Sequence, residues 1–384
     1  MRIAILELVK THAGFELEFD RIIIEELKKQ GHEPVLFLPE NSRLEADLGI
    51  PIEYMAGGAI VNYENVGRLT KFWWAFQREL RRVKWFNSAY AKAQSGEVDA
   101  IILTTATYRY LRSLHKSKLK NSPIPVIFIF LGVNPQEKKL FLNEARKCAT
   151  YENIKLKITS LRNDFTKETL SNIEIIPPPV IVPAHFCAEV EENELGRYPI
   201  KIGFFGHYRK GEKDVEGILQ AFLAAKLGEK AKLVVQAAPS TAKDAKALDK
   251  IMQKYVHLPE ISFIHGKLVG EKWNNALQAV DVVFLPYTAK RYLYNWSGVY
   301  FNAIGFYKPV LVTKTLNPEV LAKYEIGMEV ELQDMAIFQQ QLQEFVQSYE
   351  KKKSIYKLEL ARANKEFAHK NFIGNLLGDI EENV

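Results

Sequence analysis

Groups that could bind phosphate occur in three short segments in the second half of the sequence. Gly206 is followed by Arg209 and Lys213, the pair His265-Gly266 comes later, and Ser297-Gly298 opens an apolar segment that is predicted to be helical. Guanidinium and ammonium groups pair with phosphate oxygens, and the free N–H groups of a helix start attract anions. A glycine at such a place lets a ligand approach the backbone closely. The three segments therefore have the chemistry of an anion-binding site.

Each segment follows a short apolar run that is typical of a buried strand: Ile200–Phe205, Ile261–Ile264 and Asp281–Leu285. If these strands are parallel, the loops after them meet at one edge of one sheet. A single Lys or Arg in a loop is more often a solvated surface charge, so the interpretation depends on this convergence. We expect a site that binds a diphosphate.

The motifs of other phosphate and metal chemistries are absent from the sequence. It has no Walker A loop, no HExxH zinc motif and no nucleophile elbow, and the three loops contain no Asp-x-Asp. We therefore expect no metal ion and no other cofactor.

The first half of the sequence is predicted to form a parallel sheet with a ligand-binding edge of its own. Arg2–Leu8 is predicted to be a strand, Glu16–Gln30 a helix and Glu33–Leu38 a second strand, which together make a βαβ unit of a parallel sheet. The loop between the first strand and the helix contains Thr11, His12 and Gly14, and Asn134 follows the later predicted strand Ile124–Leu131. We place these four residues on a ligand-binding edge of the first domain, with His12 as a catalytic candidate. The alternative for His12 is an ordinary surface or hydrogen-bonding role.

The βα alternation runs twice along the chain and predicts two domains. The Pro-rich stretch from Pro177 to Pro183, with the acidic run Glu189–Glu194, is the best candidate for a linker. We expect a first domain over residues 1–183 and a second over 199–345. Helices are expected over 346–384, crossing back to the first domain. The fold class is α/β, with two doubly wound, Rossmann-like domains that face each other across a cleft.

Lys71–Phe86 is predicted to be an amphipathic helix that is both basic and aromatic. Seven Lys and Arg residues against one acid lie between Arg68 and Lys92, and five more without an acid lie in Arg109–Lys120. Helices of this kind bind anionic membrane surfaces. The usual alternative is a core-facing helix with a solvated polar side. A nucleic-acid-binding helix would leave the second domain unexplained, so no nucleic acid is expected as a partner.

The composition of the chain indicates which broad class of protein it belongs to. The chain has 384 residues with 47% hydrophobic and 26% charged residues, enough for two α/β cores. No apolar run is long enough to span a bilayer, the start of the sequence does not read as a secretory signal, and Cys148 and Cys187 have no metal-ligand spacing. We expect a cytoplasmic protein, with peripheral contact to the inner face of the membrane as an option.

The second half, over residues 200–330, resembles the nucleotide-sugar-binding domain of GT-B-fold glycosyltransferases, particularly the retaining group called family 4. The resemblance is carried by IGFFGHYRKGEKDVEGILQAF, ISFIHGKL, and AVDVVFLPY followed by SGVYFNAIGFYKPVLVT. It implies transfer of a sugar from a nucleoside diphosphate sugar, expected to be a UDP-sugar, to a glycan or lipid-linked acceptor, with retention, in polysaccharide or glycolipid synthesis. It also implies an acceptor-binding first domain and a donor-binding second domain.

The resemblance assigns the donor contacts. Arg209 and Lys213 are implied at the diphosphate, with backbone N–H groups from Ser297, Gly298 and Val299. The other residues implied around the donor are Gly206, His207, His265, Lys267, Tyr294 and Asn302. The family has two glutamates where this sequence has Tyr294 and Asn302. Asn302 can still hydrogen-bond a ribose hydroxyl, whereas Tyr294 cannot act as a carboxylate.

Two alternatives remain open at this point. A sugar-nucleotide epimerase has the same fold but is expected to carry catalytic acids, in which these loops are poor. A non-catalytic nucleotide-sugar-binding protein would bind the donor without turnover. Release of UDP from a UDP-sugar separates an enzyme from a binding protein.

Overall fold

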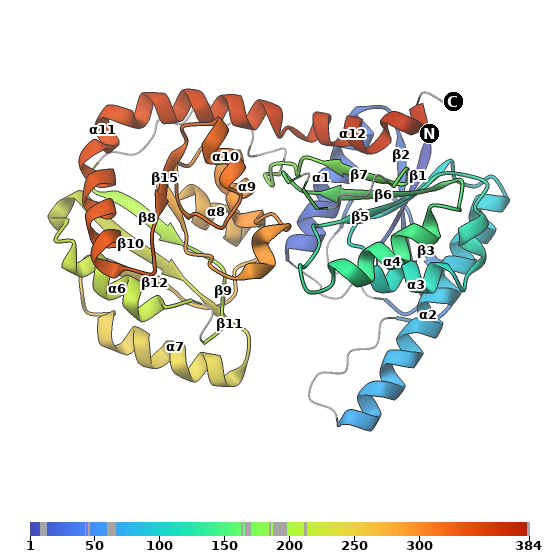
Figure 1. Cartoon of the computed structure of the whole chain (residues 1–384), viewed down its shortest axis with the longest axis horizontal. Helices are drawn as coiled ribbons and strands as arrows, with labels where there is room; N and C mark the ends of the chain where they lie inside the picture. The colour runs from blue at the N-terminus through green and yellow to red at the C-terminus, as the bar shows by residue number, and fades with distance from the viewer. Residues whose placement is uncertain are drawn as a thin grey trace. The chain divides into compact units, whose positions relative to one another are not determined.

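The computed structural model describes residues 1–7, 14–42, 44, 47–59, 67–162, 164–165, 170–183, 186, 198–210 and 213–381, without the side chains of 68, 69, 71 and 379–381. The chain forms two compact units. Unit 1 comprises Met1–Pro177 and His369–Val384, and unit 2 comprises Pro178–Ala368. Each unit contains one large parallel sheet with helices around it (Figure 1).

The sheet of unit 1 has seven strands in the order β3-β2-β1-β4-β5-β6-β7, and all neighbours are parallel. The strands are β1 (Arg2–Leu6), β2 (Glu33–Pro39), β3 (Ile52–Met55), β4 (Ala100–Leu103), β5 (Val126–Phe130), β6 (Ile154–Thr159) and β7 (Ile173–Ile176). The central strands β1, β4 and β5 are buried almost throughout, as expected for apolar runs that are covered on both faces. The predicted βαβ start of the chain is confirmed.

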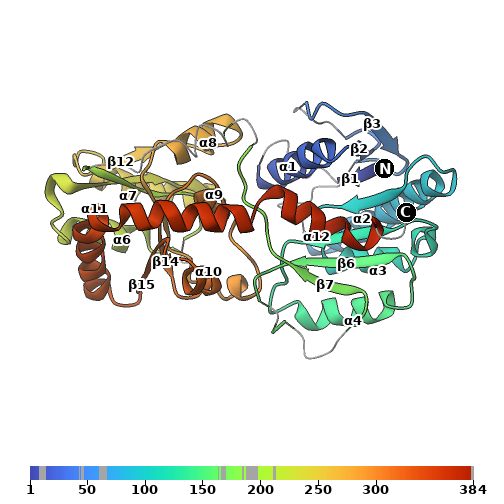
Figure 2. The ribbon, with the colours of Figure 1, turned by 90° about the horizontal axis from the view of Figure 1, so that it is seen from above.

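The helices of unit 1 are α1 (Phe15–Lys29), α2 (Arg68–Gln94), α3 (Tyr108–Leu114), the short η1 (Lys118–Asn121), α4 (Lys138–Cys148) and α12 (His369–Glu381). The last of these comes from the end of the chain and lies beside α1 (Figure 2). The rings of Phe19 and Phe372 meet edge to face with 5.7 Å between their centroids. Lys157 Nζ on β6 donates to the carbonyl of Asn375 at 3.1 Å. An aromatic contact and a partly buried hydrogen bond thus attach α12 to the rest of unit 1.

The sheet of unit 2 has six parallel strands in the order β12-β10-β8-β13-β14-β15. They are β8 (Ile200–Phe204), β10 (Ala231–Gln236), β12 (Ile261–Ile264), β13 (Val282–Leu285), β14 (Val310–Thr313) and β15 (Gly327–Val330). The strand order reverses between β8 and β13, because β10 and β12 continue on one side of β8 while β13, β14 and β15 lie on the other. Ligands of doubly wound sheets bind at such a reversal, outside the carboxyl ends of the strands.

The helices of unit 2 are α6 (Val215–Ala224), α7 (Ala242–Tyr255), α8 (Glu271–Gln278), α9 (Gly298–Gly305), α10 (Pro318–Lys323) and α11 (Met335–Glu366), with the short η2 (Gly228–Lys230) and η3 (Lys290–Leu293). A small parallel pair, β9 (His207–Tyr208) and β11 (Ala238–Pro239), extends the segments that follow β8 and β10 (Figure 1). In the part of the chain that the structure describes, no helix is both long and apolar enough to cross a membrane.

Candidate functional site

The carboxyl edge of the unit 2 sheet brings together the segments that follow β8 and β13. Gly206 has φ of +122°, a conformation that side chains rarely adopt. A Cβ atom at this position would lie 3.1 Å from Tyr287 Oη and 3.5 Å from Lys213 Nζ. Gly206 is thus required both by its backbone angle and by the space around it, and the three residues meet at one point.

The ammonium group of Lys213 lies against two aromatic faces at this point. Its Nζ atom is 4.2 Å from the centroid of the Tyr287 ring and 5.1 Å from that of Phe204. Lys213 is only 9% exposed, so its charge is held close to the strand ends instead of extending into water. Aromatic faces attract a cation without neutralising its charge. The arrangement places one fixed positive charge at the strand-order reversal.

Tyr287 is held by hydrogen bonds at both of its ends. Its hydroxyl donates to the carbonyl of Phe205 at 3.2 Å, and its own carbonyl accepts from Thr313 Oγ1 at 2.5 Å and Thr315 Oγ1 at 3.0 Å. Burial raises the pKa of Tyr287 well above its usual range, so the phenol stays neutral. Tyr287 therefore serves as a rigid, uncharged wall beside Lys213.

A buried glutamine links two of the loops that the sequence predicted to converge. Gln236, the last residue of β10, accepts the N–H of Gly206 at 3.1 Å and donates to the carbonyl of Gly266 at 2.7 Å. Its side chain is 1% exposed. The loops after β8 and β12 are therefore tied through β10, which lies between their strands. Sequence analysis missed this residue; the only signal for it is a polar residue at the end of a buried strand.

Asn317 is a second polar residue that sequence analysis missed, and it holds the start of α9. Ser297 is the N-cap, and its hydroxyl accepts the N–H of Tyr300 at 3.4 Å. The N–H of Ser297 itself donates to Asn317 Oδ1 at 3.2 Å. This differs from the expectation that all of Ser297, Gly298 and Val299 offer their N–H groups to a phosphate. Gly298 and Val299 open the helix, where N–H groups have no acceptor within the helix.

Arg209 directly follows β9. Its Nε atom donates to Ser240 Oγ at 3.3 Å, and its side chain is exposed. His207 in β9 and the segment His265–Lys267 are also exposed. Gly266 has φ of +85°, which turns the chain immediately after β12. These residues border the edge that Gly206 and Lys213 occupy, and their side chains are accessible.

Asn302 and Tyr294 differ in burial and in the element that holds them. Asn302 is buried in α9, where its amide donates to the carbonyl of Ile181 and accepts from Trp273 Nε1 at 3.4 Å. Both the nitrogen and the oxygen of the Asn302 amide thus have hydrogen-bond partners within unit 2. Tyr294 is half-buried at the end of η3, in the loop that leads to Ser297.

The predicted ligand edge of unit 1 is only partly described. Thr11 and His12 lie outside the described residues. Gly14 is the N-cap of α1, with φ of 144°, and its carbonyl accepts the N–H of Glu18 at 3.2 Å. Asn134 follows β5, and its Oδ1 accepts the N–H of Gln136 at 3.0 Å in a turn. Among the described residues there is no group of three or more His, Cys, Asp and Glu side chains that could hold a metal ion.

Comparison with solved structures identifies the fold. One match is Anabaena Alr3699/HepE in complex with UDP and glucose, at 15% identity and a TM-score of 0.65 over 99% of this chain and 100% of that chain. A glycosyltransferase from Rickettsia africae ESF-5 matches at 12% identity and a TM-score of 0.64, over 99% and 98%. WaaG, a glycosyltransferase involved in lipopolysaccharide biosynthesis, matches at 13% identity and 0.58, over 98% and 100%.

Sequence comparison adds nothing to these matches, because no protein-family model matches the chain and no curated protein does. The structural matches extend over nearly the full length of the chain and of each neighbour, so they include both units. The expected α/β fold with two doubly wound domains is confirmed, and so is the resemblance to GT-B-fold glycosyltransferases. The chain has the fold of GT-B glycosyltransferases, with two Rossmann-like α/β domains.

Proposed function

We propose that the protein is a glycosyltransferase that takes a sugar from a nucleoside diphosphate sugar bound at the carboxyl edge of the unit 2 sheet. The observation that carries the proposal is the meeting of Gly206, Lys213 and Tyr287 at the strand-order reversal, where the segment after β13 leads on to the start of α9. A backbone without a Cβ atom, a fixed cation and a helix N-terminus are three groups that favour a diphosphate. The structural neighbour HepE, which has been solved with UDP and with UDP-glucose, supports the choice of a UDP-sugar.

In the proposed reaction, the bond between the anomeric carbon of the sugar and the diphosphate oxygen breaks. A hydroxyl oxygen of the acceptor forms the new bond to that carbon, and its proton passes to the departing diphosphate. Charge develops on the departing diphosphate, and groups already fixed around it stabilise that charge without reorganising. The proposal gives this role to Lys213, to Arg209 and to the N–H groups of Gly298 and Val299.

The proposal assigns the remaining groups as follows. Gly206 leaves room for the phosphates. The exposed residues His207, His265 and Lys267 border the edge where the nucleoside lies. Tyr294 is the candidate contact for the sugar, and Asn302 supports α9 from within. In this scheme the cations neutralise the diphosphate, so a metal ion is not required.

The acceptor is proposed to be a glycan or a lipid-linked sugar, and transfer is proposed to retain the configuration of the anomeric carbon. The acceptor candidates Thr11, His12, Gly14 and Asn134 all belong to unit 1, which would accordingly bind the acceptor. Replacement of His12 by alanine or asparagine would separate a catalytic role from an ordinary surface role.

The experiment that tests the proposed function compares UDP-, GDP-, ADP- and CDP-sugars. A thermal shift identifies which nucleotide binds, and release of the free nucleoside diphosphate in the presence of candidate acceptors measures turnover. We expect one UDP-sugar to stabilise the protein and to be consumed. Binding of a UDP-sugar without any turnover would favour a binding protein, and interconversion of sugar epimers would favour an epimerase. If no nucleotide sugar binds, the proposal is wrong.

A further inference from the structure

Helix α2 carries large apolar side chains that are exposed to solvent. Phe72 is 79% exposed, Trp73 56%, Phe76 49% and Leu80 42%. At about 100° per residue these four side chains lie within one third of the helix circumference, so they form a single stripe. We call this stripe the α2 tip. The later part of the same helix is built into the unit, with Trp85 and Phe86 fully buried.

The α2 tip is therefore not the core-facing side of an ordinary surface helix. Figure 1 shows the first half of α2 extending past the sheet and the other helices of its unit. The rings of Trp73 and Phe76 lie 6.1 Å apart and are tilted, and they contact each other at the surface. Contiguous exposed aromatic side chains of this kind mark an interaction surface.

A concentration of positive charge adjoins the α2 tip. Glu79, the only acid of α2, interacts with Lys116, Arg112 and Arg82, which together lower its pKa against the effect of burial. The pKa of Arg82 is lowered chiefly by burial and also by the nearby Arg78 and Arg109. Three cations thus adjoin the carboxylate of Glu79, and Arg78 and Arg109 lie near one of them, Arg82. We call Arg78, Arg82, Arg109, Arg112 and Lys116 the basic cluster.

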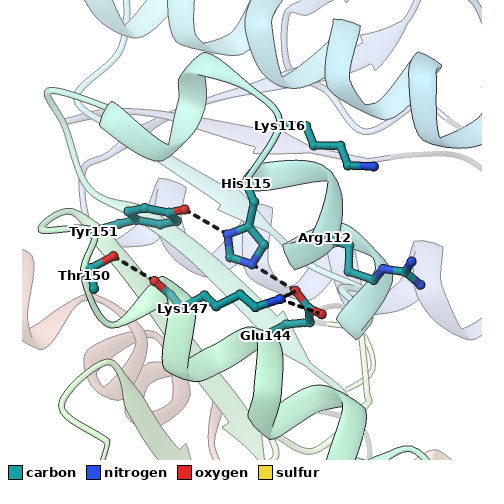
Figure 3. A pocket seen from close by; sticks show the side chains of 7 residues that line it. All are labelled: Arg112, His115, Lys116, Glu144, Lys147, Thr150 and Tyr151. Carbon is teal, nitrogen blue, oxygen red and sulfur yellow. Dashed lines mark hydrogen bonds and ion pairs between the residues drawn. The ribbon is translucent and has the colours of Figure 1, made fainter.

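Part of the basic cluster borders an open pocket of about 590 Å³ between α3 and α4. Arg112 and Lys116 extend to the same side of it, as Figure 3 shows. The one acid of the pocket, Glu144, is already engaged by His115 Nε2 at 3.1 Å and by Lys147 Nζ at 3.2 Å. Lys116 and Lys147 are 63% and 60% exposed. The cations of this face are therefore accessible, and its acids are paired.

We infer that the α2 tip and the basic cluster form one docking surface for an anionic lipid bilayer. Aromatic side chains on a helix prefer the region between lipid headgroups and acyl chains, and neighbouring Lys and Arg residues attract anionic headgroups. The link between the two parts is the ion pair of Lys116 with Glu79, which joins the segment after α3 to the side of the stripe. This surface belongs to unit 1 and uses none of the residues proposed to bind the donor.

The test is co-sedimentation of the full chain with vesicles of phosphatidylcholine, alone or mixed with phosphatidylglycerol. The tip variant is Phe72→Ser, Trp73→Ser and Phe76→Ser combined. Its matched control is Ile337→Ser, Ile355→Ser and Leu358→Ser, three apolar residues of α11 that are 46%, 43% and 63% exposed. We expect wild type and control to bind the mixed vesicles, and the tip variant to lose binding at least about tenfold.

A second pair of variants tests the charges. Arg78→Gln with Arg112→Gln removes two cations of the basic cluster, and Lys246→Gln with Lys250→Gln removes two exposed cations of α7 as the control. The first pair is expected to weaken binding about tenfold or more, and raised salt should have the same effect on wild type. The control pair should bind like wild type.

Three results would overturn the inference: no preference for anionic vesicles, equal binding by the tip variant, or a loss of binding in the α11 control. Light scattering without vesicles gives a fourth, because a larger particle for wild type than for the tip variant would mean that the tip binds another copy of the chain. A thermal shift with UDP-glucose in solution is expected to be the same for all variants. This readout separates a failure of the docking surface from a failure of the proposed function.

Discussion

The Nζ atom of Lys213 lies 4.2 Å from the centre of the Tyr287 ring, which joins the segment after β8 to the segment after β13. These two strands are neighbours at the place where the strand order of unit 2 reverses. The contact therefore fixes a cation at the point where doubly wound sheets bind their ligands. The proposed function depends on this one position more than on any other residue.

Gly206 is predicted to tolerate no side chain. Gly206→Ala would force a Cβ onto a backbone with φ of +122° and place it 3.1 Å from Tyr287 Oη. Strained backbone of this kind costs about 1–3 kcal/mol, so we expect a loss of that size in the free energy of unfolding, measured with urea, together with weaker UDP-sugar binding.

The matched control is Gly374→Ala. A Cβ on Gly374 in α12 would have no heavy atom within 4 Å, and the φ of this residue is not positive. A helical glycine replaced by alanine is expected to gain about 0.5–1 kcal/mol. If both variants behaved alike, the close approach at Gly206 would have no energetic importance.

Gln236→Leu is expected to loosen two loops at once. The change leaves the N–H of Gly206 and the carbonyl of Gly266 without their partner, at a cost of about 1–3 kcal/mol in the free energy of unfolding. Because both loops border the proposed donor site, the dissociation constant of a UDP-sugar should rise as well.

Gln343→Leu distinguishes this effect from a general loss of stability. Gln343 Nε2 donates to the carbonyl of Ala225 at 2.8 Å, between α11 and the end of α6. This variant should also lower the free energy of unfolding, yet leave UDP-sugar affinity unchanged. If Gln236→Leu and Gln343→Leu had equal affinities for the UDP-sugar, Gln236 would have no specific role at the donor site.

Much of this arrangement could be predicted from the sequence, because local patterns determine it. Short apolar runs predicted the strands β8, β12 and β13, and Gly206 and Lys213 follow the first of them. Gln236 and Asn317 could not be predicted, since their partners lie 30 and 20 residues away and only the strand order brings them together.

Strand β15 was missed for a related reason. It begins at Gly327, a poor strand former, and only the neighbouring strand explains this glycine, because a Cβ there would clash with the carbonyl oxygen of Val310 on β14. The edge strand β3 was also missed, and it is half exposed. Edge strands with few apolar residues show little hydrophobic pattern in the sequence. They form because they pair with the neighbouring strand of the sheet.

Asp20→Asn is predicted to stabilise the protein at neutral pH. Asp20 is 1% exposed, and burial together with the nearby Glu7 raises its pKa well above the usual range, with Glu16 adding to the rise and Thr104 opposing it. The folded state therefore holds a proton that the unfolded state releases above a pKa of about 3.9. This contribution is complete below that pH and is lost as the pH rises through the raised pKa.

The measurement is the midpoint of thermal unfolding as a function of pH. The variant should melt higher than wild type at neutral pH, and the difference should shrink toward acid pH. Asp249→Asn, at an exposed position of α7, serves as the control and should show no such trend. A difference between Asp20→Asn and wild type that did not depend on pH would contradict a raised pKa for Asp20.

The most direct test of the proposed function is the dissociation constant of UDP-glucose for wild type, Lys213→Ala, Arg209→Ala and Lys232→Ala. Lys232 is an exposed cation on β10 and serves as the control. A charge-assisted hydrogen bond contributes about 1.5–3 kcal/mol, so each of the first two changes should weaken binding by about tenfold to a hundredfold. The control should bind like wild type. Unchanged affinity for both Lys213→Ala and Arg209→Ala would contradict a diphosphate site at this edge of the sheet.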